Sequence, residues 1–456
     1  MLPKKFEERM RSLLGNEYEA FRASLECEAV RGIRINPAKS SSEYFLHRDD
    51  LSLSQLPYTE LGFIPENQTG LGKMPEHHAG MFYVQDPGAM ATVCALNVQK
   101  GWQVLDACAA PGGKASQLAA AIGDEGFLVA NEYVPKRAKI IVGNLERLGV
   151  RNSFVTSLDT LQLSEMYSGV FDLTLCDAPC SGEGMFRKYG EAIEEWSEEN
   201  VNKCAKRQRE ILENLSSTVK SGGYLLYSTC TFSPEENEMV IINFLDSHPE
   251  FSLQEVKEEL IDVTHPGISN LSDKYDLTKA RRFYPHLSRG EGQFIALLKK
   301  QENSTDMPTI LYKSNEKPLT KEELLITDKF FRDNFTQIPS GRLIKQGDGI
   351  AILPGNIPVP PHSLFMAGVM AGEISKGVFF PHHQLFSAYG NLFKRREELT
   401  KDDPRVEKYL RGEEIEAISC CESGYAAVIY EGASLGGGKA SGGRIKNHYP
   451  KGLRNK

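Results

Sequence analysis

The stretch Val104-Leu105-Asp106-Ala107-Cys108-Ala109-Ala110-Pro111-Gly112-Gly113-Lys114 passes from an apolar run through a glycine turn into a helix-compatible segment. Such a turn brings backbone N–H groups and a helix amino terminus close to a ligand. It lacks the three spaced glycines of a dinucleotide fingerprint, and Ala115 stands where a phosphate loop has Ser or Thr. The alternative is a tight turn without function. However, Asn131-Glu132 ends the next strand about 20 residues on, where a carboxylate commonly accepts hydrogen bonds from ribose. The glycine turn and Glu132 at this spacing together favour a nucleoside ligand without a polyphosphate.

Around this turn, residues 102–300 alternate short β-rich runs with helical stretches, which is typical of a doubly wound parallel sheet. We expect Gly222-Gly223 to close one helix and to admit the next strand. The pattern predicts an α/β, Rossmann-like core. Its strands are expected at 103–107, 126–130, 153–155, 171–176, 224–227 and 294–298, with helices at 136–148, 200–219 and 235–246.

The chain of 456 residues is too long for one compact core. Residues 1–95 predict an α+β module, and residues 96–300 form the α/β domain. Residues 301–321 are polar and predict a linker. Residues 322–456 predict a second α+β region, which ends in a glycine-rich basic segment from Gly436 to Lys456.

The composition excludes several classes of protein. With 40% hydrophobic and 25% charged residues, it is that of a soluble globular protein. The amino terminus predicts an amphipathic helix rather than a signal peptide, and no apolar stretch is long enough to cross a bilayer. We therefore expect a cytoplasmic protein without a membrane partner. The net charge of -8 argues against indiscriminate coating of nucleic acid, but it allows a nucleic-acid substrate bound at a local basic face.

Two cysteines follow apolar runs at points where the pattern breaks. Cys180 lies in Asp177-Ala178-Pro179-Cys180-Ser181-Gly182, and Cys230 lies in Ser228-Thr229-Cys230-Thr231. Both should lie at the carboxyl ends of strands, which is the edge where ligands bind in open α/β sheets. Two soft nucleophiles beside an acid and a glycine-rich loop indicate covalent catalysis. A small buried hydrophobe is the commoner role of a lone cysteine, and we assign that role to Cys176, Cys27, Cys94 and Cys204.

The nine cysteines are an odd number, lie largely within apolar runs and are expected to be reduced. A metal site is not expected. Paired C-x-x-C motifs are missing, and His77-His78 and His382-His383 are neighbours whose side chains diverge. Short basic clusters such as Arg187-Lys188 predict solvated surface.

Three motifs, in chain order, resemble those of the Sun-family (NSUN-type) RNA cytosine-5 methyltransferases, which use S-adenosylmethionine. They are Ala109-Ala110-Pro111-Gly112-Gly113-Lys114 and the two cysteine motifs given above. Supporting matches are Gln208-Arg209-Glu210-Ile211-Leu212, Pro234-Glu235-Glu236-Asn237-Glu238 and Phe283-Tyr284-Pro285-His286. One position departs from the pattern, because Gln293 stands where many members have a second aromatic residue.

The chemistry of cytosine C5 explains why such residues are needed. C5 is a poor nucleophile, and attack of a thiolate on C6 converts the ring to an enamine-like species that accepts a methyl group at C5. An acid such as Asp177 can hydrogen-bond N3 and spread the developing charge. The enzyme thiol must later be eliminated, and a second base or thiol can assist. The residues alone do not decide which cysteine attacks.

The resemblance implies a role for each residue. Cys230 attacks, Cys180 assists product release, Asp177 contacts the base and Lys114 lies close to the reacting centre. The implied cofactor contacts are Cys108, Ala109, Ala110, Pro111, Gly112, Gly113, Lys114, Glu132 through ribose, Arg137, Asp159 near adenine, and Asp177.

The last part of the chain, residues 435–454, looks like the end of bacterial RsmF-type enzymes, which act on 16S ribosomal RNA. In those relatives a PUA-like RNA-binding fold follows the catalytic domain, and an RNA-recognition domain precedes it. The basic, glycine-rich tail with Tyr449 indicates an RNA-contacting surface. We expect 16S ribosomal RNA or the small ribosomal subunit as partner, and a monomer. Two alternatives remain, namely a transfer RNA cytosine-5 methyltransferase and a non-catalytic ribosome-assembly protein.

Overall fold

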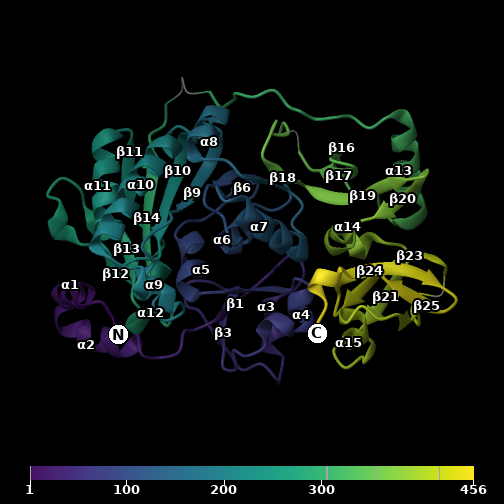
Figure 1. Cartoon of the computed structure of the whole chain (residues 1–456), viewed down its shortest axis with the longest axis horizontal. Helices are drawn as coiled ribbons and strands as arrows, with labels where there is room; N and C mark the ends of the chain where they lie inside the picture. The colour runs from purple at the N-terminus through teal and green to yellow at the C-terminus, as the bar shows by residue number, and fades with distance from the viewer. Residues whose placement is uncertain (1, 304–306, 356, 421, 456) are drawn as a thin grey trace.

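A mixed ten-stranded sheet forms the centre of the protein. The computed structural model describes residues 2–303, 307–355, 357–420 and 422–455, and Figure 1 shows its arrangement. The strands are β5 (Gln103–Asp106), β6 (Phe127–Asn131), β7 (Ser153–Thr156), β9 (Phe171–Asp177), β10 (Val219–Thr229), β11 (Phe251–Gln254), β12 (His265–Pro266), β13 (Arg281–Phe283), β14 (Gln293–Lys300) and β18 (Leu364–Ala367). Their order is β12-β13-β14-β10-β9-β5-β6-β7-β18, and β11 pairs with β14.

Strands β10, β9, β5, β6 and β7 run parallel, and β14 is antiparallel to β10. This Rossmann-like arrangement confirms the predicted fold class. All six strands expected from the sequence are present.

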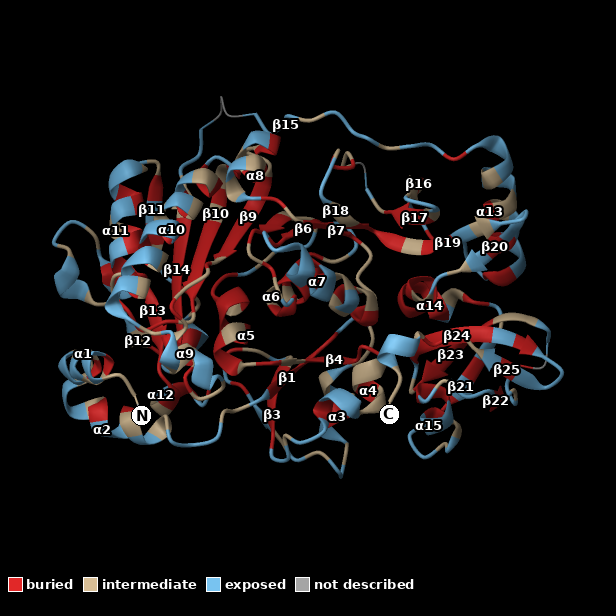
Figure 2. Cartoon of the chain, in the orientation of Figure 1, coloured by how far each residue is buried: buried red, intermediate tan, exposed pale blue. Residues whose placement is uncertain are grey.

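Helices cover both faces of the sheet, as Figure 2 shows by the buried strands between exposed helix surfaces. Successive strand residues point to opposite faces. Val104 therefore packs in one cluster with α5 (Pro87–Cys94), α6 (Gly113–Ile122) and α7 (Pro135–Leu148). Leu105 packs in the other with α8 (Thr160–Met166), α10 (Glu198–Ser216) and α11 (Glu238–Ser247). Burial on both faces explains why these strands appear as continuous apolar runs.

The prediction that Gly222-Gly223 closes a helix was wrong. Helix α10 ends at Ser216, and the two glycines lie inside β10. The register of β10 against β9 shifts between Val219 and Tyr224, and Gly222 has a φ of 73°. The glycines therefore form an irregularity near the start of a long strand, where a positive φ favours glycine.

The amino-terminal module begins with the helices α1 (Lys4–Leu14) and α2 (Tyr18–Ser24) and continues with a four-stranded antiparallel sheet. The short helices α3 (Ser42–Leu46) and α4 (Pro75–His78) lie in the connections between its strands. The strands β1 (Gly32–Ile35), β2 (Leu53–Gln55), β3 (Gly62–Pro65) and β4 (Phe82–Gln85) have the order β2-β3-β1-β4. Phe6 and Phe21 pack with Phe186, Phe232 and Tyr284 in one aromatic cluster. The two helices thus pack against segments that follow the two cysteine motifs.

The carboxyl-terminal region contains two further sheets. One has the order β16-β17-β19-β20, from β16 (Arg342–Gln346), β17 (Gly349–Leu353), β19 (Val369–Ser375) and β20 (Val378–Pro381). The other has the order β21-β23-β24-β25-β22, from β21 (Arg396–Leu399), β22 (Ile415–Glu416), β23 (Gly424–Tyr430), β24 (Ala433–Ser441) and β25 (Arg444–Asn447). Helix α13 (Lys321–Asn334) packs against β20.

This region is also attached to the central ten-stranded sheet. Strand β18 pairs antiparallel with β7 and so extends the central sheet. The predicted linker 301–321 contains β15 (Thr309–Ile310), which pairs with β8 (Tyr167–Ser168). Residues 304–306 of that linker lie outside the described residues. Among the described helices, none has both the length and the apolar character needed to span a membrane.

The tail differs from the sequence-based expectation. Tyr449 is only 2% exposed, and its ring packs against those of His78, His383 and Tyr409. It was therefore wrong to expect this ring on an RNA-contacting surface. The glycines have a packing role as well. Helix α14 (His383–Tyr389) lies against β24, and a Cβ at Gly437 would lie 2.2 Å from the Phe386 ring.

We expect the substitution Gly437→Ala to destabilise the carboxyl-terminal sheet by about 1–3 kcal/mol, because the buried Phe386 ring cannot move aside without disturbing the core. The matched control is Gly452→Ala, since a Cβ at Gly452 would meet nothing within 4 Å. Chemical denaturation of both variants measures the difference. Equal stabilities would contradict the proposed packing role.

Candidate active site

The two cysteine motifs meet at the carboxyl ends of neighbouring parallel strands. Ser228 of β10 is in register with Asp177 of β9, and the N–H of Ala178 donates to the Ser228 carbonyl at 2.8 Å. The Sγ atoms of Cys180 and Cys230 lie 3.2 Å apart. The hydrogen bond with the Cys230 thiol, together with burial, raises the pKa of Cys180 well above its usual value. Cys180 therefore stays a thiol at neutral pH.

Three donors fix the Asp177 carboxylate beside the thiols. Lys114 Nζ, from the first turn of α6, donates to Oδ2 at 2.8 Å. The Ser228 hydroxyl and the Gln293 amide donate to Oδ1 at 2.6 and 3.3 Å. Burial alone would lower the pKa of Lys114, but the charge and hydrogen bond of Asp177 outweigh it and raise that pKa. The site thus contains a largely buried ion pair.

The contact made by Gln293 was not foreseen from the sequence. This residue begins β14, it is 4% exposed, and its side-chain amide donates to Asp177. The sequence marked it only as a departure from the family's aromatic residue. The departure itself was the available signal, because an amide in place of a ring can donate a hydrogen bond to the acid of the adjacent motif.

A buried carboxylate, Glu236, holds the Cys180 loop in place. It accepts from the backbone N–H of Ser181 at 2.9 Å and also from the Ser181 hydroxyl. The Gln208 side-chain amide donates to Glu236 at 2.9 Å and to the Pro179 carbonyl at 3.0 Å. Burial raises the pKa of Glu236 to about 7. Gln208 and Glu236, which belong to two of the supporting motifs, therefore position the Cys180 loop.

A second buried carboxylate, Glu183, joins this loop to the Cys230 loop and to the amino-terminal helix. It accepts from the Phe232 N–H at 3.1 Å, from Trp196 Nε1 at 2.7 Å and from the Arg9 guanidinium of α1. In addition, the Gly184 N–H donates to the Cys230 carbonyl at 2.9 Å. Both cysteine loops are thus connected to each other by short-range contacts.

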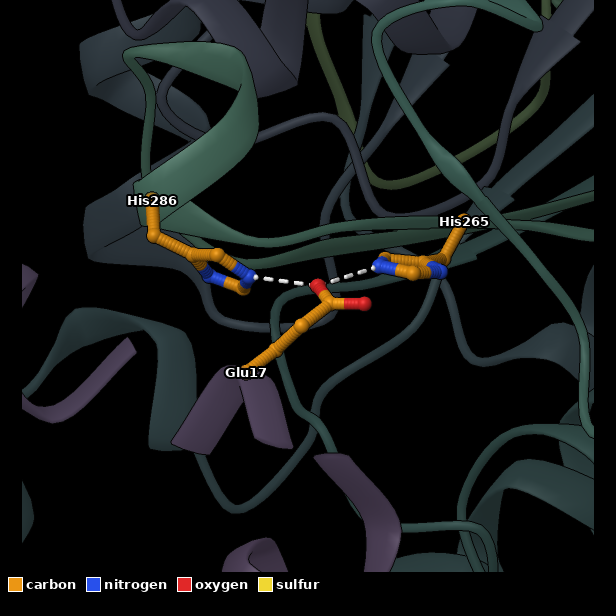
Figure 3. Close-up of side chains that lie close together, drawn as sticks. All are labelled: Glu17, His265 and His286. Carbon is orange, nitrogen blue, oxygen red and sulfur yellow. Dashed lines mark hydrogen bonds and ion pairs between the residues drawn. The ribbon is translucent and has the colours of Figure 1, made fainter. Parts of the chain in front are cut away.

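One group of described side chains has ligand atoms close enough to one another to suggest a cation site, namely Glu17, His265 and His286 (Figure 3). Both histidine Nε2 atoms contact the same oxygen, Glu17 Oε2, at 2.9 Å for His265 and 3.0 Å for His286. The hydrogen bonds from His286 and His265 lower the pKa of Glu17. These two hydrogen bonds connect Glu17, which lies between α1 and α2, to His265 in β12 and to His286 in α12 (Pro285–Ser288).

The sequence did not reveal this group, because its members are far apart in the chain. The adjacent histidines named in the sequence, His77-His78 and His382-His383, lie outside this group. For example, the His78 ring contacts the Tyr449 hydroxyl at 2.8 Å and Asn455 Oδ1 at 3.0 Å.

The glycine turn lies between β5 and α6, at the same edge of the sheet as the thiols. Residues Cys108 to Gly113 form it, and Gly112 has a φ of 110°. The Gly112 N–H donates to the Ala109 carbonyl at 2.7 Å. Cys108 contacts the buried Cys176, whose pKa is raised first by that hydrogen bond and then by burial. This agrees with an inert, structural Cys176.

The other predicted cofactor residues follow the neighbouring strands. Glu132 follows β6, is 4% exposed, accepts from the Val134 N–H at 2.9 Å and lies 3.4 Å from Arg137 Nη1. Arg137 Nη2 also contacts the Ala110 carbonyl at 3.4 Å. Asp159 is exposed, and its Oδ1 accepts from the Gln162 N–H at 2.8 Å, which caps α8. All these residues therefore lie along one edge of the sheet, after β5, β6 and β7.

Asp106, the last residue of β5, was missed by the sequence analysis. Its side chain is fully buried, and neither carboxylate oxygen has a hydrogen-bond partner among the described residues. Burial, followed by the charge of Asp177, raises the pKa of Asp106 to about 8. An orphaned buried carboxyl fits a cationic ligand group. The available signal was an acid inside an apolar run, directly before the glycine turn.

Comparison with known proteins places these features in a family. The model of the 16S rRNA methyltransferase RsmB/F family matches residues 93–299, that of the amino-terminal domain of 16S rRNA methyltransferase RsmF matches 2–87, and that of the methyltransferase RsmF PUA domain matches 396–455. The last match covers the sheet β21 to β25.

Similar proteins match over nearly the whole chain. The chain is 31% identical to a ribosomal RNA small subunit methyltransferase F from Aeromonas salmonicida, over 95% of this chain and 93% of that protein. It is also 31% identical to the protein of that name from Vibrio campbellii, over 99% and 97%.

A solved structure of a methyltransferase homolog from Pyrococcus horikoshii has 30% identity and a TM-score of 0.58, and it covers 65% of this chain and 95% of its own. Family, fold and cofactor expected from the sequence are thereby confirmed, and S-adenosylmethionine is the cofactor. With a relative above 30% identity over almost its entire length, the chain belongs to the ribosomal RNA small subunit methyltransferase F family.

Proposed function

We propose that the protein methylates C5 of cytosine in 16S ribosomal RNA through a covalent adduct between Cys230 and C6. The observation that carries this proposal is the pair of thiols 3.2 Å apart beside the Asp177–Lys114 ion pair. Cytosine C5 transfer needs a nucleophile, an acid at the ring and a group that helps release the product. These three requirements match three side chains at two adjacent strand ends. The named activity of the relatives supports ribosomal RNA as the substrate.

In this mechanism the Cys230 sulfur forms the S–C6 bond and its thiol proton passes to the Asp177 carboxylate. The electron pair displaced from the C5–C6 double bond moves into the ring towards N3. Asp177 then donates this proton to N3 and takes it back on release, while Lys114 and Gln293 keep the carboxyl oriented. S-adenosylmethionine supplies an electrophilic methyl group to C5. The target base must leave its stack to reach the thiol.

Release requires that C5 lose its proton to solvent, that the C5–C6 double bond re-form and that the C6–S bond break. We assign assistance in this step to Cys180. Its raised pKa keeps it protonated, so it can donate to the sulfur of Cys230 as that sulfur departs. A thiol with a low pKa would be ionised and would repel the departing thiolate.

We propose that Asp106 would face the ammonium group of S-adenosylmethionine and that Glu132 would accept hydrogen bonds from its ribose hydroxyls. Residues Cys108 to Lys114 supply the turn, and Arg137 and Asp159 border the same edge of the sheet. The unpartnered oxygens of Asp106 support this placement, because an ammonium group would satisfy both of them.

The substitution Cys230→Ala should abolish methyl transfer while cofactor affinity stays close to that of the wild type, because only the nucleophile is lost. The measurement is incorporation of labelled methyl groups into small ribosomal subunits or 16S ribosomal RNA, with bulk transfer RNA as the competing substrate. Cys27→Ala is the matched control, since Cys27 lies outside the site and is exposed, so the burial expected for it from the sequence was wrong. Full activity of Cys230→Ala would exclude it as nucleophile, and preferred labelling of transfer RNA would contradict the ribosomal substrate.

The substitution Cys180→Ala should instead trap a protein–RNA adduct, because Cys230 can still attack but is released slowly. The adduct should survive denaturing electrophoresis and should be missing in a Cys180→Ala, Cys230→Ala double variant. If Cys180→Ala turns over at the wild-type rate with no trapped species, Cys180 has no role in release.

Cofactor binding should release about one proton at pH 6.5. The Asp106 carboxyl, whose pKa is raised to about 8, is protonated in the empty site at that pH. An ammonium group favours the carboxylate, so affinity should rise by up to about tenfold per pH unit towards pH 8. Calorimetry in buffers with different ionisation enthalpies measures the proton. Asp106→Asn should release none, and a wild-type protein that releases none would refute the assignment.

A further inference from the structure

A cavity lies between the amino-terminal module and the segment that follows the Cys180 loop. Its volume is about 910 Å³, within the range of pockets that enclose small organic ligands. It is separate from the residues to which the previous subsections assign catalysis or cofactor binding. The lining residues come from four segments, namely 28–31, 66–69, 84–86 and 187–189.

One wall of this cavity contains a buried amide. Gln85, at the end of β4, is 6% exposed and lines the cavity. Its Oε1 accepts from Arg34 Nε at 2.8 Å, but its Nε2 has no hydrogen-bond partner among the described residues. This Nε2 atom is sealed from solvent, so Gln85 supports the wall of the cavity and presents no free donor to a ligand.

The cavity adjoins the reacting centre. A Cβ built on Gly113 would lie 3.4 Å from the Gln85 side-chain amide, so this amide rests against the amino terminus of α6. The next residue, Lys114, forms the ion pair with Asp177. The Gln85 side chain and the first turn of α6 therefore separate this cavity from the Asp177–Lys114 ion pair.

The charges in the lining are balanced and mostly paired. Lys188 Nζ contacts Asp86 at 3.1 Å, and Arg187 Nε donates to the buried Glu291 at 2.9 Å. The Arg187 side chain is only 4% exposed, so the sequence-based expectation of a solvated surface was wrong for it. The basic lining residues Arg31, Arg187 and Lys188 face an equal number of acidic ones, Glu28, Glu66 and Asp86. This balance disfavours a phosphate group and favours an uncharged polar ring.

The rim offers the contacts that such a ring needs. The Tyr189 side chain is 60% exposed and can stack on a base. Asn67 accepts the Thr69 N–H through Oδ1 at 3.0 Å, and Gln68 accepts the Arg31 N–H through Oε1 at 2.6 Å. These bonds orient both side chains through their oxygens and leave their NH₂ groups as donors for the edge of a base.

We propose that this cavity receives the unstacked base of a nucleotide that neighbours the target cytosine in the RNA. The inference rests on the proposed function, because extrusion of the target cytosine leaves its neighbours without their stacking partner. The cavity would then set the sequence context in which a cytosine is methylated. Tyr189 stacks on the neighbouring base, and the amides of Asn67 and Gln68 contact its edge.

The test uses the full-length protein and an RNA fragment that contains the methylated cytosine, as mapped in 16S ribosomal RNA. Each nucleotide around that cytosine is replaced in turn by an abasic one, and kcat/KM for methyl transfer is measured. One abasic position should lower kcat/KM of the wild type by about tenfold. Tyr189→Ala and Asn67→Ala should lower it by a similar factor on intact RNA and show no further loss on that abasic RNA.

Controls separate this proposal from folding defects and from the proposed function. Asn97→Ala, which changes an exposed asparagine outside the cavity, should behave like the wild type on every RNA. Cofactor affinity of both cavity variants should be unchanged. An active wild type that is indifferent to every abasic position, or variants whose losses multiply with the abasic loss, would overturn the cavity proposal alone. A wild type that methylates no RNA would overturn the proposed function and the cavity assignment with it.

Discussion

The parallel pairing of β9 with β10 is the constraint on which the site depends. Because Ser228 is in register with Asp177, both strands end at the same height and both cysteine motifs begin there. Parallel strands cannot be joined by a short hairpin, so the two motifs are separated by a crossover that includes α10. A shift of one residue in this register would turn alternate side chains to the other face of the sheet. The 3.2 Å approach of the two thiols would then be lost.

The loops after these strands are held by buried carboxylates rather than by apolar packing alone. Glu236 fixes the Cys180 loop through Ser181, and Glu183 fixes the Cys230 loop through Phe232. A buried carboxylate is costly unless several donors satisfy it, and each of these has at least three. Such directional contacts hold a loop more precisely than apolar contacts do, and they keep the two thiols at a fixed separation.

Much of the core could be predicted from the sequence, and the reason is physical. The central strands are buried on both faces, so they appear as short apolar runs such as Val104-Leu105, and their carboxyl ends mark the edge where function lies. The motif residues around Asp177, Cys180 and Cys230 meet at that edge. The assignment of individual roles rests on the resemblance, because two cysteines at similar strand ends are equivalent in the sequence.

The remainder depends on contacts between residues far apart in the chain. Tyr449 lies in a segment whose composition is typical of a basic, exposed tail. It is nevertheless buried, because the rings of His78, His383 and Tyr409 pack around it. The glycines of β24 allow that close packing and do not indicate flexibility. In the sequence Asp106 is one acid at the end of an apolar run, and only the fold shows that its carboxylate oxygens lack hydrogen-bond partners among the described residues. Local patterns indicate elements, whereas tertiary packing decides which polar groups are left unsatisfied.

The amino-terminal module is part of the catalytic structure and is not merely attached to it. The buried guanidinium of Arg34, whose pKa burial lowers to about 10, donates to the Gly113 carbonyl at 3.2 Å and to the Ser116 hydroxyl at 2.6 Å. These contacts hold the first turn of α6, which carries Lys114. On its other side, the module shares one hydrophobic cluster with the carboxyl-terminal sheet, in which Phe45 and Tyr409 take part. The two outer regions are therefore fixed relative to the thiols. A substrate that binds both regions would reach the site in a defined orientation, so recognition at a distance and positioning of the base are consequences of the same packing.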